Sequence, residues 1–164
     1  MDAHAIFSNP VNTHLFVAAL LGAIIGLERE LAGKDPSLRT FALISVGSCI
    51  FSMLSLYVTA GSDHADPGRI AAQIIPGIGF LGAGTIFRQK RGVSGLTTAA
   101  LMWVTAGIGM AVGLDRMDLA VSTTIVALFI TFGLKYVHMG IQHLRPNHHS
   151  QDMDDEDKEV SKIE

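Results

Sequence analysis

The sequence is poor in charge and in cysteine. Asp, Glu, Lys and Arg make up only 16% of its 164 residues, whereas a soluble domain devotes about a quarter of its residues to charge. The single cysteine, Cys49, excludes a disulfide framework and a four-ligand zinc site. No Lys or Arg precedes Arg29, so the first apolar run lacks the basic start of a secretory signal peptide, and we expect it to be retained as a helix.

The few charges are confined to short clusters. Between them lie five runs of 16 to 21 residues without Asp, Glu, Lys or Arg: Val11–Leu27, Thr40–Ala60, Ile70–Phe87, Leu96–Leu114 and Leu119–Leu134. A helix needs about 20 residues to cross the hydrocarbon of a bilayer. The sequence therefore predicts an all-α membrane protein, a bundle of five transmembrane helices over residues 11–137. Residues 1–10 precede it, and residues 138–164 form an acidic, histidine-containing tail that we expect to be disordered.

The basic residues predict an orientation. Ten of the twelve Lys and Arg lie between runs one and two, between runs three and four, or after run five; the other two are Arg69 and Arg116. Because cytoplasmic loops are enriched in Lys and Arg, the N-terminus is expected outside and the tail in the cytoplasm.

Proline and small polar residues mark the expected helix starts. Asn9-Pro10, Asp35-Pro36 and Asp66-Pro67 each place an N-cap side chain before a proline in the first helical position. Ser94 and Asp118 are the expected caps of the fourth and fifth helices.

The stretch "PGIGFLGAGTIF" (76–87) contains the spacing G-x-G-x-x-G of dinucleotide-binding enzymes. That motif follows a strand and is joined by an acid about 20 residues later, yet no Asp or Glu occurs from Thr85 to Leu114. Small residues also let membrane helices approach closely, although glycine is common in such helices for no special reason. The packing interpretation places the third run at the centre of the bundle and assigns helix contacts to Gly22, Gly26, Gly77, Gly79, Gly82, Ala83, Gly84, Gly109 and Gly113.

Four stretches carry a family resemblance: "GAIIGLERE" (22–30), "LRTFALISVGS" (38–48), "DPGRIAAQIIPGIGFLGAGTIF" (66–87) and "GLTTAALMWVTAGIGMAVG" (95–113). In order and spacing they resemble the MgtC/SapB family of bacterial membrane proteins. The resemblance implies a multi-pass inner-membrane protein linked to adaptation to low magnesium and, in pathogens, to virulence. It further implies regulation of other membrane proteins, such as ATP synthase or cation transporters. Many members carry a cytoplasmic C-terminal domain, whereas here we expect a short form with only a tail after the last span, and Thr97 stands where some virulence-associated members have Asn.

Two groups of polar residues are candidate functional sites. Glu28, Arg29 and Glu30 end the first run, and with Arg39 and Arg88 they form either an ion-pair network for docking or simple interfacial anchors.

Asp66, Arg69 and Gln73 begin the third run. Either they line a polar pocket, or they form a helix cap and an interhelical hydrogen bond. Gln73 is expected to face the bundle.

The loops on the predicted outer side carry Asp63, Asp66, Asp115 and Asp118, which could bind Mg²⁺ weakly or simply be solvated. No catalytic constellation is present, so we expect no enzyme and no other cofactor. The expected partners are the lipid bilayer, a second copy of the chain in a homodimer or higher oligomer, and other membrane proteins, but no nucleic acid. Regulation of membrane partners is the leading hypothesis. The alternative is a transporter or channel for Mg²⁺ or another cation, with its pore at an oligomer interface.

Overall fold

The computed structural model describes residues 9–60, 66, 68–89 and 92–144. Its helices are α2 (Pro10–Leu31), α3 (Leu38–Thr59), α4 (Arg69–Ala72), α5 (Ile74–Ala83), α6 (Leu96–Gly113) and α7 (Met117–Leu144). The chain divides after Leu128 into two compact units, and the packing described below lies within the first. Among the described residues, α2, α3, α6 and the Met117–Leu134 part of α7 are long and apolar enough to cross a membrane.

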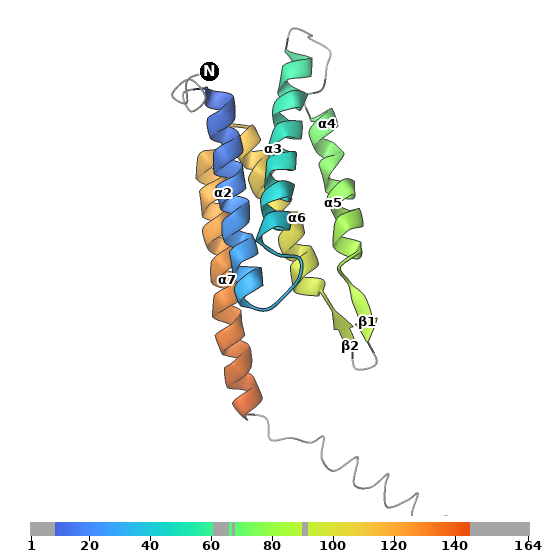
Figure 1. Cartoon of the computed structure of the whole chain (residues 1–164), viewed down its shortest axis with the longest axis vertical. Helices are drawn as coiled ribbons and strands as arrows, with labels where there is room; N and C mark the ends of the chain where they lie inside the picture. Colours follow the sequence, from blue (N-terminus) through green and yellow to red (C-terminus); the bar gives the residue numbers. More distant parts are fainter. Residues whose placement is uncertain (1–8, 61–65, 67, 90–91, 145–164) are drawn as a thin grey trace, which may run out of the picture. The chain divides into compact units, whose positions relative to one another are not determined.

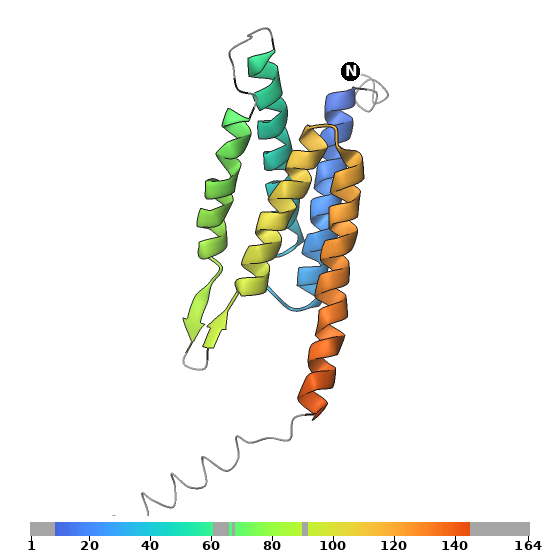
Figure 2. The same ribbon diagram turned by 180° about the vertical axis from the view of Figure 1, so that it is seen from behind.

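The centre of the first unit is α3, which contacts α2, α6 and α4 (Figure 1). Seen from behind, α6 lies next to α5 as well (Figure 2), and it also contacts α2. The third apolar run was expected at the centre of the bundle, and this expectation was wrong. In the described part of the chain that run forms α4, which contacts α3, and α5, which contacts α6, and a Cβ on Gly77 or Gly79 would meet nothing within 4 Å.

Four glycines allow α2, α3 and α6 to approach one another at backbone distance. A Cβ atom on Gly22 would lie 2.6 Å from the carbonyl oxygen of Phe41, and one on Gly26 would lie 2.5 Å from the Cα of Leu38. On α6, a Cβ on Gly109 would overlap the backbone of Ser45, and one on Gly113 that of Cys49. The missing side chains therefore set the spacing of the three central helices.

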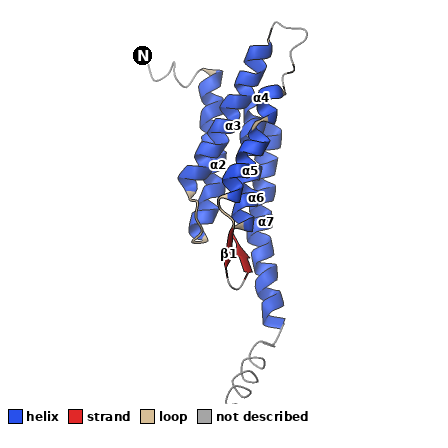
Figure 3. Ribbon diagram, turned by 90° about the vertical axis from the view of Figure 1, so that its right-hand side faces the viewer, coloured by secondary structure: helices blue, strands red, loops and turns tan. Residues whose placement is uncertain are grey.

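The third run is shorter as a helix than expected. Helix α5 ends at Ala83, and the chain then forms a two-stranded hairpin, β1 (Phe87–Gln89) with β2 (Gly92–Ser94), which Figure 3 shows in red beyond the lower end of α5. The strands are antiparallel, with Arg88 opposite Val93. The prediction of a purely helical chain thus missed the hairpin, because the end of α5 at Gly84 and Thr85 carries no charge to mark it.

Gly95 closes this hairpin onto the helices. Its φ of 89° lies in the left-handed region, and a Cβ on it would overlap the carbonyl group of Thr85. A glycine is needed here because both the backbone angle and the close approach exclude a side chain.

The helix starts follow the predicted caps only in part. Asn9 caps α2 through a hydrogen bond from the Val11 amide (3.0 Å), with Pro10 in the first turn. The other predicted caps are displaced: α3 is capped by Ser37 instead of Asp35, α4 by Gly68 instead of Asp66, and α6 by Gly95 instead of Ser94. Asp118 lies inside the first turn of α7. The caps of α3, α4 and α6 lie one or two residues after the predicted ones, whereas α7 begins one residue before Asp118. The pattern therefore located these turns but not their cap residues.

Replacing Asn9 by alanine is expected to destabilise the protein by about 1 kcal/mol, because the Val11 amide loses its acceptor. Thermal unfolding in detergent measures the change. Asn9→Asp is the control and should unfold within a few tenths of a kcal/mol of the native chain, since it keeps an oxygen at the cap. An equal loss in both variants would contradict the capping role.

Helix α7 runs to Leu144, past the boundary that we expected after residue 137. The remainder of the predicted tail (residues 145–164) and residues 1–8 of the N-terminal segment lie outside the described residues.

The core of the first unit contains a stripe of hydroxyl groups. On α3, Ser45, Ser48, Ser52 and Ser55 are all buried. Ser52 donates to the carbonyl oxygen of Ser48 (2.9 Å), a bond within the same helix. The hydroxyls of Ser45 and of Thr105 on α6 are also buried and have no hydrogen-bond partner among the described residues. The serines thus serve chiefly as small packing residues against the glycines of α2 and α6.

Candidate functional site

The C-terminal end of α2 carries a buried ion pair. Glu28 and Arg29 are only 5% and 7% exposed. The Nε and Nη2 atoms of Arg29 donate to the two carboxylate oxygens of Glu28, so the pair is bidentate. Each buried charge therefore has the other as its hydrogen-bonded partner. Burial of either charge alone would cost several kcal/mol.

The turn after α2 covers this end of the helix. The Lys34 amide donates to the carbonyl oxygen of Arg29 (3.0 Å), and the Ala32 amide to that of Glu28 (3.0 Å). At the start of α3, the Leu38 amide points toward a carboxylate oxygen of Glu30 at 3.4 Å. Arg29 also lies in the last turn of α2, where a cation is favoured by the helix dipole.

Of the two alternatives for these five charges, the ion-pair network does not form in the described part of the chain. Arg39 and Arg88 are exposed, and neither makes an ion pair with Glu28 or Glu30. Arg88 lies on β1 of the hairpin instead of at the end of a helix. The pattern located five charges near one end of the helices, but only the two adjacent residues of α2 are paired.

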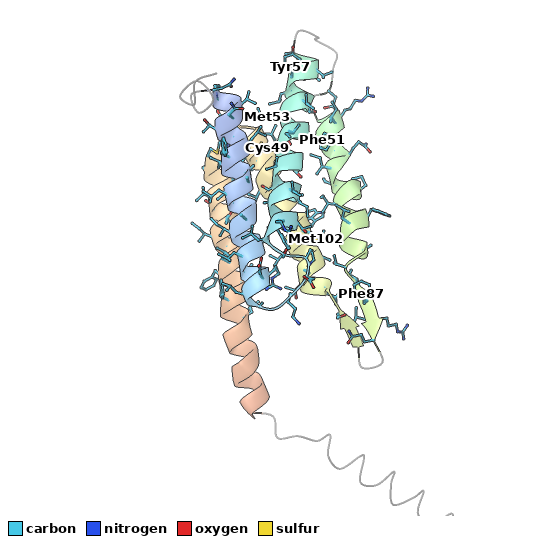
Figure 4. The ribbon with its side chains drawn as sticks, viewed as in Figure 1. Cys49, Phe51, Met53, Tyr57, Phe87 and Met102 are labelled. Carbon is cyan, nitrogen blue, oxygen red and sulfur yellow. The ribbon has the colours of Figure 1, made fainter. Side chains whose placement is uncertain are left out.

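A groove of about 620 Å³ separates α3 from α4 and α5. Its walls are mostly Leu and Ile side chains and Phe51, which Figure 4 labels on α3. The polar exceptions are Thr40, Ser48 and Gln73. Gln73 was expected to face the bundle, and it lines this groove opposite α3. It is nevertheless exposed, and its side chain makes no hydrogen bond among the described residues.

The glycines of α5 differ from those of the central helices. Cβ atoms on Gly77 and Gly79 would meet nothing within 4 Å, whereas one on Gly82 would pack against Ala99 of α6 at 3.5 Å. Ala83 and Gly84 are exposed. Only Gly82 of the predicted packing residues in this run therefore makes a close contact between helices of the described chain.

The carboxylates at the other end of the helices each have a local partner. A carboxylate oxygen of Asp115 lies 3.1 Å from Nε2 of His14. Asp118 pairs with Arg116 (3.0 Å), whose pKa is raised by the hydrogen bond to that carboxylate and by its charge.

Asp66 does not pair with Arg69; its side chain accepts the Gly68 amide (2.8 Å). Asp63 lies outside the described residues, and among those described no three His, Cys, Asp or Glu side chains gather as a metal site would require. Thr97 is exposed in the first turn of α6.

Two features were missed by reasoning from the sequence. The first is the burial of the Glu28–Arg29 pair. Gly26, two residues before Glu28, was an available signal, because a Cβ added there would meet α3. The second is that the hydroxyls of Ser45 and Thr105 are both buried without a hydrogen-bond partner among the described residues. No sequence pattern indicates this.

Comparisons with known proteins agree with the resemblance seen in the sequence. The sequence model of the MgtC family matches residues 15–139. Protein MgtC of Salmonella typhimurium is 43% identical over 135 residues, which cover 82% of this chain and 57% of that protein. The Escherichia coli protein named putative magnesium transporter YhiD is 40% identical over 143 residues, covering 84% of this chain and 65% of that protein.

An uncharacterized protein of Haemophilus influenzae is 44% identical over 121 residues, which cover 70% of this chain and 51% of that protein. The chain thus spans between about half and two thirds of the length of these relatives. No solved structure matches the chain. With a family match over most of its length and four helices apolar enough to cross a bilayer, the chain belongs to the MgtC family and is a multi-pass membrane protein.

Proposed function

We propose that this protein is a bacterial inner-membrane regulator that acts on other membrane proteins during adaptation to low magnesium. Family membership and the name of the Escherichia coli relative, putative magnesium transporter YhiD, support the link to magnesium. The proposal extends to self-association, for which a two-fold dimer is the commonest closed arrangement, and to the absence of enzymatic activity.

We propose five membrane crossings, with the N-terminus outside and residue 144 inside. The third crossing is the difficult one, because α4 and α5 together cover residues 69 to 83, about 22 Å of helix at ~1.5 Å per residue. The chain continues through Thr85 to the hairpin and returns along α6, which contacts α5. A short helix followed by extended chain is enough to span most of the roughly 30 Å of hydrocarbon. The bias of Lys and Arg supports the orientation.

The observation that carries the regulatory proposal is the closed contact among α2, α3 and α6. Backbone meets backbone at Gly22, Gly26, Gly109 and Gly113, which leaves little room between these helices. The buried ion pair sits in the last turn of α2 and not in the middle of a span. A transport path is usually marked by ionisable or polar groups facing a water-filled cavity. The groove beside α3 is instead mostly apolar, as a surface for hydrophobic partners would be.

Transport of Mg²⁺ is the second candidate. The name of the Escherichia coli relative favours it, and so do the unpartnered hydroxyls of Ser45 and Thr105 in the core, since oxygen atoms are the ligands that Mg²⁺ prefers.

Flux measurements on the purified protein separate the two candidates. The chain is reconstituted into liposomes that contain an Mg²⁺-sensitive dye, with an ionophore as positive control. We expect Mg²⁺ entry to equal that of protein-free liposomes. Entry above this level that is lost in both Ser45→Ala and Thr105→Val, but not in the exposed control Thr97→Val, would overturn the regulatory proposal in favour of transport.

A further inference from the structure

The groove between α3 and the α4–α5 segment has the dimensions of hydrocarbon chains. It extends from Thr40 to Phe51 on α3 and from Ile70 to Leu81 on the facing segment, which is about 16 Å at ~1.5 Å per residue. Its volume is about 620 Å³. A hydrocarbon chain is only about 4–5 Å wide, given carbon contacts near 4 Å, so one or two such chains fit along the groove.

Two facing glycines keep the groove open. Gly47 on α3 and Gly77 on α5 both line it, and a Cβ on either would meet nothing within 4 Å. Neither glycine is needed for contact between helices of this chain, unlike Gly109 or Gly22. Their missing side chains create space for something outside the protein.

Polar groups at one end of the groove are ordered like the parts of a phospholipid. Arg69, Gln73 and Gly77 follow one another at intervals of four residues and so lie on one face of the α4–α5 segment. Arg69 is exposed and makes no ion pair among the described residues. One turn further, the free amide of Gln73 lies on the groove, and beyond Gly77 the α5 wall consists of Ile78 and Leu81.

We propose that this groove is a binding site for a phospholipid, with its phosphate at Arg69, an ester group at Gln73 and its acyl chains between Gly47 and Gly77. The guanidinium group binds phosphate oxygens through paired, charge-assisted hydrogen bonds. The amide of Gln73 supplies a donor for an ester carbonyl and thereby satisfies a polar group that otherwise faces hydrocarbon without a partner. The acyl chains cover the Leu and Ile side chains that line the groove.

Native mass spectrometry of the full-length protein in detergent tests this site. Delipidated protein is titrated with phosphatidylglycerol, and the retained lipid is counted. We expect Gly77→Leu, which fills the groove, to weaken binding by about tenfold or more, a loss of at least ~1.4 kcal/mol. Gly79→Leu is the matched control: Gly79 lies on the same helix, is equally exposed and unobstructed, but does not line the groove. It should bind within about twofold of the native chain.

Two further variants make the result specific. Gly47→Leu blocks the groove from the opposite wall and should weaken binding like Gly77→Leu, which guards against a folding defect confined to α5. Arg69→Gln should weaken binding of phosphatidylglycerol but not of diacylglycerol, which has no phosphate. Equal binding by the Gly77 and Gly79 variants would overturn the proposal. So would a change of oligomeric state in Gly77→Leu without loss of lipid, since the groove would then serve a second copy of the chain.

Discussion

Replacing Gly109 by alanine is expected to destabilise the protein by about 3 kcal/mol. In the interior of a helix this change normally stabilises by ~0.5–1 kcal/mol, because glycine has more freedom to lose on folding. At Gly109 the added Cβ would lie within 2.9 Å of the Cα of Ser45 and overlap its carbonyl group. The backbone of α3 cannot rotate away as a side chain could, so the strain of overpacking exceeds the propensity gain.

Gly107 provides the matched control for this substitution. It lies on the same helix, two residues away, but it is exposed and a Cβ there would meet nothing within 4 Å. Gly107→Ala should therefore leave stability unchanged or raise it by up to ~1 kcal/mol. Reversible unfolding in mixed detergent micelles measures both variants. If the two changes had the same sign and size, the backbone contact between α3 and α6 would not be what holds these helices together.

Replacing Arg29 by methionine is expected to cost about 3–5 kcal/mol, because the carboxylate of Glu28 would remain buried without a partner. Glu28→Leu should cost a similar amount for the converse reason. The double variant, Glu28→Leu with Arg29→Met, should recover to within ~1 kcal/mol of the native chain, since apolar side chains of similar volume can replace a buried pair.

A double-mutant cycle measured by the same unfolding assay gives the coupling between the two residues. Arg39→Met is the control: Arg39 is exposed at the start of α3 and should change stability by less than ~0.5 kcal/mol. Additive losses in the double variant would show that Glu28 and Arg29 do not act as a pair.

Four helices could be predicted from the distribution of charge. The runs Val11–Leu27 and Thr40–Ala60 correspond to α2 (Pro10–Leu31) and α3 (Leu38–Thr59). Leu96–Leu114 corresponds almost residue for residue to α6, whereas α7 continues ten residues past the last run, to Leu144. A charged residue ends the part of a helix that can lie in hydrocarbon, but it does not end the helix. The charge distribution therefore predicts the membrane-spanning segments better than it predicts the ends of the helices.

The third run shows where this reasoning fails. Hydropathy does not distinguish the end of α5 at Ala83 from the strand that begins at Phe87, because the residues between them are uncharged. The conformation there depends on Gly95, which lets the chain return against Thr85. That contact joins residues ten apart in the sequence, and a local pattern does not contain it.

The glycine spacing identified possible contact faces but not which faces have a neighbour. Gly22-x-x-x-Gly26 and Gly109-x-x-x-Gly113 meet the backbone of α3, whereas Gly77 and Gly79 meet nothing in the described chain. A small residue permits a close approach, but the arrangement of the other helices decides whether one occurs. The same limit applies to the charges. The sequence predicts Arg39 and Arg88 at the same end of the helices as Glu28, but Glu28 forms its ion pair with Arg29.

The number of membrane crossings is tested most directly by the side on which the β1–β2 hairpin lies. Single cysteines at Lys34→Cys, Gln89→Cys and Asp115→Cys are introduced into a Cys49→Ala background and labelled in intact cells with a membrane-impermeant maleimide. Five crossings predict that Lys34→Cys and Gln89→Cys are both protected until the cells are opened, while Asp115→Cys is labelled at once. Labelling of Gln89→Cys in intact cells, with Asp115→Cys protected, would mean that α4 and α5 enter the bilayer and return on the same side before α6 crosses, and would contradict the five-crossing arrangement.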